Sequence, residues 1–94
     1  MKIPCNLVGP VIGRLRSRQG MSQSQFVVRL QRHGWDISRE VLARIETRRR
    51  RVADFELAFI ARCLKVSASE LIPKIGLNQQ VDDLIERLEY SKET

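Results

Sequence analysis

Two short helix patterns, each opened by a serine, follow one another in residues 21–51. Ser22 has the position of an N-cap, and Gln25, three residues later, completes a capping box. Ser38 caps the second pattern, and Gly34 between the two ends the first helix. An apolar residue precedes each serine and another follows inside the helix, which is the hydrophobic staple that fixes the direction of a helix start. The segment is therefore predicted to form two short helices joined by a turn.

Helical spacing of apolar residues continues on both sides of this pair. Pro10 suits the first turn of a helix that Gly20 ends. Caps and apolar stripes predict further helices over residues 53–64, 67–71 and 78–90. No segment alternates with period two for long enough to make a strand, so the predicted fold class is all-α. We expect an extended N-terminus over 1–8, one domain over 9–73 and a helical extension over 74–94.

Positive charge is concentrated in the predicted domain. The 94-residue chain has a formal charge of +6, and residues 1–73 alone carry 14 lysines and arginines against 6 acids, a net of +8. Residues 74–94 carry a net of −2. This balance favours a polyanionic partner. Arginine outnumbers lysine 13 to 4; either its flat guanidinium is needed to bind phosphate and guanine, or a GC-rich coding sequence produces the bias.

The sequence offers no chemistry for catalysis or for a cofactor. Two cysteines and one histidine cannot assemble a zinc site, and no nucleophile has an evident acid or base partner. We expect Cys5 and Cys63 to be free thiols, with Cys63 in the core. There is no apolar run long enough to span a membrane and no signal-peptide pattern, so a cytoplasmic protein is expected. No segment indicates a small-molecule effector.

Residues 9–72 resemble the lambda-repressor-like, Cro/C1-type (XRE) helix-turn-helix family. The resemblance rests on the order and spacing of three stretches: GPVIGRLRSRQGMSQSQF, ISREVLARIE and RRVADFELAFIARCLKVSASELI. It implies a compact five-helix bundle, here followed by a short C-terminal helix, and it implies a recognition helix over about 38–47 in the major groove. It also implies that Gln23 braces this helix and touches a phosphate, and that Glu46 pairs with Arg16.

The chain departs from the family pattern at three places. Val27 stands where the family has a small residue, which would set the helix pair slightly farther apart. The turn LQRHGWDIS is about three residues longer than the shortest family form. Arg48 replaces a common glycine, the residue that most readily adopts a left-handed cap at the end of the recognition helix.

The predicted DNA contacts lie on the recognition helix, at its ends and at the start of the helix before it. Arginines can donate two hydrogen bonds to guanine, a glutamate can accept one from cytosine or orient an arginine, and a small alanine permits close approach. Arg48–Arg51 either lines the DNA backbone or solubilises the chain, and Arg50 or Arg51 can pair instead with an acid at 54 or 56. The full set of predicted contacts is Gln23, Ser38, Arg39, Glu40, Ala43, Arg44, Thr47, Arg48, Arg49 and Arg50.

These features predict a sequence-specific, double-stranded DNA-binding transcriptional regulator that is not an enzyme. Because one module reads few base pairs, a homodimer is expected, with the last helix either joining two copies or packing back onto its own bundle. The alternative is an antitoxin or protein-interaction module on the same fold. Away from DNA, we expect Trp35 to pack between the second and third helices and His33 to lie exposed in the turn.

Overall fold

The computed structural model describes residues 4–73, 82–83 and 85–86, and these residues contain helices and no strand. The ordered elements are α1 (Gly9–Arg18), α2 (Gln23–Arg32), α3 (Arg39–Glu46), α4 (Asp54–Leu64) and a single 3₁₀ turn, η1 (Ala68–Leu71). The all-α prediction is therefore confirmed. The last helix, predicted over 78–90, lies largely outside the described residues. Its predicted role in joining two copies lies outside them too and stays a prediction.

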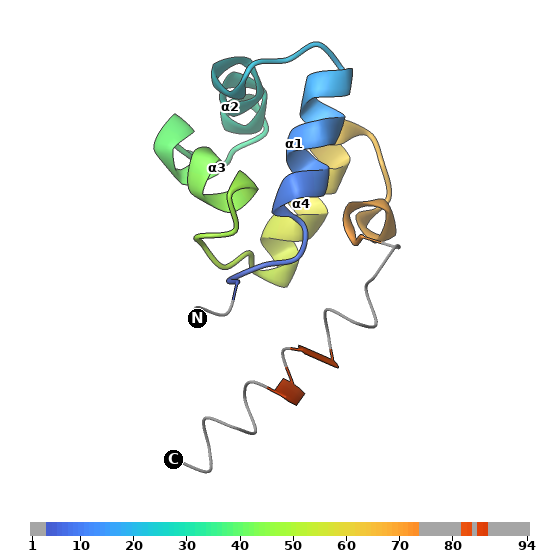
Figure 1. Cartoon of the computed structure of the whole chain (residues 1–94). Helices are drawn as coiled ribbons and strands as arrows, with labels where there is room; N and C mark the ends of the chain where they lie inside the picture. Colours follow the sequence, from blue (N-terminus) through green and yellow to red (C-terminus); the bar gives the residue numbers. More distant parts are fainter. Residues whose placement is uncertain (1–3, 74–81, 84, 87–94) are drawn as a thin grey trace.

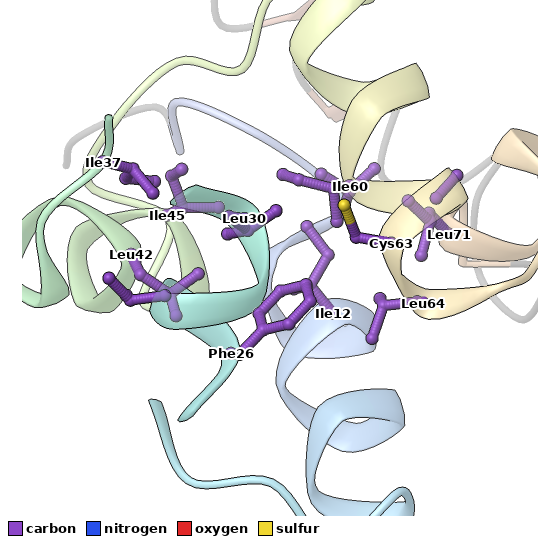
Figure 2. Close-up of a cluster of buried hydrophobic side chains, with 13 residues drawn as sticks. Ile12, Phe26, Leu30, Ile37, Leu42, Ile45, Ile60, Cys63, Leu64 and Leu71 are labelled. Carbon is purple, nitrogen blue, oxygen red and sulfur yellow. The ribbon is translucent and has the colours of Figure 1, made fainter. Parts of the chain in front are cut away.

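The four α-helices surround one apolar core. α3 packs against α1 and α2, whereas α4 packs against α1, α2 and η1 (Figure 1). Side chains from every element meet between them, as the close-up in Figure 2 shows. Those with no exposed surface at all are Ile12, Phe26, Leu30, Leu42, Ile45, Ile60, Leu64 and Leu71. The predicted buried position of Cys63 is confirmed, and both cysteines are free thiols.

The serine caps predicted from the sequence are present at both helices of the central pair. The Ser22 hydroxyl accepts the Gln25 N–H at 3.1 Å, and the Gln25 side chain accepts the Ser22 N–H at 2.8 Å. The Ser38 hydroxyl accepts the Val41 N–H at 3.2 Å. These bonds satisfy amides that the first helical turn leaves unpaired, which is why the starts of α2 and α3 were readable from sequence.

All four α-helices end in a Schellman motif, with a residue in the left-handed region after the last turn. Gly20 and Gly34 supply that residue after α1 and α2, as predicted. After α3 and α4 it is Arg48 (φ 64°) and Lys65 (φ 61°). The cap that the family pattern implies is therefore present even though Arg48 replaces the glycine, because two backbone bonds, Arg48 N–H to Ile45 O and Arg49 N–H to Arg44 O, hold it there.

The prediction of a fifth helix needs correction, and the prediction for Trp35 needs an addition. The predicted fifth helix is only the 3₁₀ turn η1, and its capping box is half formed: the Glu70 carboxylate accepts the Ser67 N–H, but the Ser67 hydroxyl bonds to Ser69 instead. Trp35 packs on the core, and its ring partner, which the prediction did not include, is Phe59 of α4, edge to face at 5.8 Å.

Lys65, like Arg48, is a non-glycine residue held at positive φ. We expect Lys65→Gly to raise the free energy of unfolding by about 1 kcal/mol, because glycine adopts a positive φ without a Cβ penalty. Gly34→Ala is the matched control, since an added Cβ there meets nothing within 4 Å and only φ is penalised. Urea titration should show the two changes with opposite signs, and a Lys65→Gly variant no more stable than the parent would contradict the cap assignment.

Candidate nucleic-acid interface

The two sides of α3 differ in character along the whole helix. Leu42 and Ile45 have no exposed surface and belong to the core. Arg39, Glu40 and Arg44 are exposed on the opposite side. Among the described residues, the Arg44 side chain has no hydrogen-bond partner, so its guanidinium is available to a ligand. The predicted contact residues on this helix are thus gathered on one accessible face.

The remaining predicted contacts at the ends of α3 have structural bonds of their own. The Thr47 hydroxyl donates to Ala43 O at 2.8 Å and so caps the last turn. Ala43 itself is half-buried, while Ser38, the N-cap, is exposed. The helix therefore presents a small side chain at its centre, flanked by longer charged ones.

A bidentate ion pair fixes the end of α3 to α1. Arg16 Nε and Nη2 donate to the two Glu46 carboxylate oxygens at 2.8 and 3.0 Å, as predicted. The Arg16 and Glu46 side chains are only 16% and 8% exposed, so the pair is largely shielded from water. The hydrogen bond to Glu46 raises the pKa of Arg16. Arg16 Nη1 also donates to Met21 O at 2.7 Å, which ties the α1–α2 turn to the same pair.

Gln23 connects this pair to the exposed face of α3. Its amide nitrogen donates to Glu46 Oε1 at 3.1 Å, and its amide oxygen accepts from Arg39 Nη1 at 3.3 Å. The bracing role predicted for Gln23 is therefore present. Through these bonds a shielded carboxylate fixes the orientation of an exposed guanidinium.

Glycine and asparagine let α1 approach α3 closely. A Cβ at Gly13 would stand 3.2 Å from Glu46 Oε1, and one at Gly9 would collide with Ile45 O. The Asn6 amide nitrogen donates to Ile45 O at 3.0 Å and to Arg50 O at 2.8 Å, while its oxygen accepts the Gly9 N–H at 2.9 Å. Asn6 was not among the residues predicted to matter. Its position three residues before Gly9, where α1 begins, was the available sequence signal.

The four-arginine run is divided between the protein and the solvent. Arg48 donates through Nε to Asn6 O at 2.9 Å. Arg50 makes a bidentate pair with Glu56 at 3.0 Å for each bond, which is the internal alternative left open by the sequence. Arg49 and Arg51 are exposed. The run therefore anchors the loop after α3 with alternate side chains and offers the other two outward.

None of the comparisons, with family models, with curated proteins or with solved structures, finds a match to this chain. The described residues contain no group of three or more metal-ligating side chains that could hold an ion. None of the helices described is long and apolar enough to cross a membrane. The exposed face of α3 and the charges around it are therefore the features that indicate a function.

Glu46 should matter for stability far more than the exposed acid on the same helix. We expect Glu46→Ala to lower the free energy of unfolding by about 2–3 kcal/mol, since it leaves Arg16 shielded from water and unpaired. Glu40→Ala should change it by less than about 1 kcal/mol, the size of a helix-terminus effect. Equal losses in parallel urea titrations would show that the ion pair does not hold α3 to α1.

Glu56 should add a measurable acid sensitivity. Hydrogen bonds from Arg50, together with the Ala53 N–H, hold the Glu56 pKa below its ordinary value of 4.5 against the opposing effect of burial. The ionised Glu56 therefore stabilises the fold fully at pH values above its ordinary pKa. This stabilisation is lost as the pH falls through the lower pKa of the folded state. The unfolding free energy of Glu56→Gln should therefore fall less steeply than that of the parent between about pH 5 and pH 3; identical slopes would exclude this contribution.

Proposed function

We propose that this chain is a sequence-specific, double-stranded DNA-binding protein, a transcriptional regulator in which α2, the turn and α3 form a helix-turn-helix. The observation that carries the proposal is the exposed, charged face of α3, held from behind by the Arg16–Glu46–Gln23 network. An α-helix fits the major groove of B-DNA, and its outward side chains then reach the base edges. Residues 1–73 supply the positive charge that such a partner requires.

The proposed base-reading residues lie where their chemistry can be used. Arg39 and Arg44 can each donate two hydrogen bonds to guanine, and Glu40 can accept one from the cytosine amine. Half-buried Ala43 allows the helix to approach the groove floor. Because Gln23 already restrains Arg39, less side-chain entropy is lost when that arginine binds. Ser38 and Gln23 are proposed to meet phosphates at the two helix starts.

The loop after α3 is proposed to follow the DNA backbone through its outward arginines only. Arg49 and Arg51 face solvent, whereas the side chains of Arg48 and Arg50 are bonded to Asn6 and Glu56. Phosphate contacts position a protein without reading sequence. Arg48 and Arg50 then serve the site by fixing the path of the loop.

Arg44 gives the most direct test of base reading. We expect Arg44→Ala to weaken binding to a cognate duplex by about 1–3 kcal/mol and to relax the base preference at one position. Quantitative gel shifts on cognate and scrambled duplexes measure both effects. A loss of equal size on the two duplexes would assign Arg44 to the backbone instead.

The outward arginines should control the salt dependence. We expect Arg49→Ala/Arg51→Ala to reduce the log–log salt slope by about 1.8, that is about 0.9 for each phosphate that is no longer neutralised. Arg50→Ala is the control, because it removes an ion pair within the protein and should leave the slope unchanged. If Arg50→Ala flattens the slope as much per residue, the division of the run into inward and outward members is wrong for the complex.

A further inference from the structure

The solvent face of α4 is a narrow stripe with an unusual apolar member. Phe55 is 73% exposed, the largest value among the exposed large hydrophobic residues of the described chain. Asp54, Ala58 and Arg62 are exposed as well. At 3.6 residues per turn these four positions fall within about 100° of the helix circumference. The buried residues of α4 are Ile60, Ala61, Cys63 and Leu64, and they belong to the core.

The charges along this stripe have opposite signs at its two ends. Asp54 stands in the first turn of α4 and Arg62 in the last, with Ala58 midway between them. Arg62 has no carboxylate partner among the described residues. Asp54 accepts only the Phe55 N–H through Oδ1, at 2.7 Å, among the bonds within the described part. A surface of this kind is complementary to a copy of itself turned through 180°.

We propose that two copies of this chain associate through antiparallel α4 helices, with the two-fold axis at Ala58. Residues equally distant from Ala58 then oppose one another, so that Asp54 of each copy faces Arg62 of the other. The alanine side chains allow close approach at the axis, and the two Phe55 rings cover the flanks of the contact. The dipoles of the two antiparallel helices also attract one another, which adds to the attraction between the Asp54 and Arg62 side chains.

This contact leaves the exposed face of α3 free. α3 packs on α1 and α2, while the packing partners of α4 are α1, α2 and η1, so the two solvent faces belong to different parts of the bundle (Figure 1). One short helix pair buries less than the roughly 1,200–2,000 Å² of a stable interface, so the free dimer is weak. Binding of both copies to one duplex would raise their effective concentration and strengthen it. The inference concerns the free protein and does not depend on DNA binding.

Sedimentation equilibrium of the full chain at low salt tests the proposal without any ligand. The parent should show a reversible monomer–dimer equilibrium. Asp54→Arg and Arg62→Asp should each weaken it about tenfold, because each variant places like charges opposite one another. The double swap should restore the parent constant. Both substitutions place a charge that is unfavourable to the α4 dipole. If they weakened association only by destabilising α4, the double variant would still associate weakly.

The contribution of Phe55 to association is tested with a second exposed apolar residue as control. Phe55→Ser should weaken association, whereas Val28→Ser, at a 45% exposed site on α2, should not. A monomer at every concentration, or a double swap that fails to restore association, overturns the proposal. So does loss of the dimer in Ile85→Ser with no response to the α4 variants, because the contact would then lie in the C-terminal segment.

Discussion

The carboxylate of Glu46 joins three helices of this fold at one point. It is largely shielded from water and accepts three hydrogen bonds, two from Arg16 and one from Gln23. These donors come from α1 and α2, so the bonds fix the end of α3 against both. Gly13 lies at the same point, where an added Cβ would stand 3.2 Å from the carboxylate oxygen. The glycine thus lets α1 approach the ion pair closely.

Much of this fold was readable from the sequence where backbone chemistry is local. Ser22 and Ser38 mark helix starts because each hydroxyl satisfies the amide three residues further on. Gly20 and Gly34 mark helix ends because they adopt a positive φ without strain. The Arg16–Glu46 pair was also predicted, from family resemblance rather than from spacing, because a contact across 30 positions leaves no local pattern.

What could not be predicted depends on which neighbour each side chain meets in the folded chain. The arginine run looks uniform in sequence, yet Arg48 and Arg50 are bonded within the protein while the other two face solvent. Arg48 keeps its left-handed conformation through the local bonds at the end of α3, together with long-range bonds to Cys5 N–H and Asn6 O. Asn6 accepts from Gly9 three residues away, but only the folded structure brings it to Ile45 O and Arg50 O, about 40 residues further along the chain.

One face of α3 packs in the core, and the opposite face is the one proposed to bind a partner. A rigid support behind an exposed charged face is the arrangement that base reading requires, because the side chains must be held in a productive geometry before the duplex arrives. Selection of bound duplexes from a random library tests this most directly. We expect enrichment of a short motif of a few base pairs that carries guanine opposite the arginines. A bound pool with the composition of the starting library would contradict it.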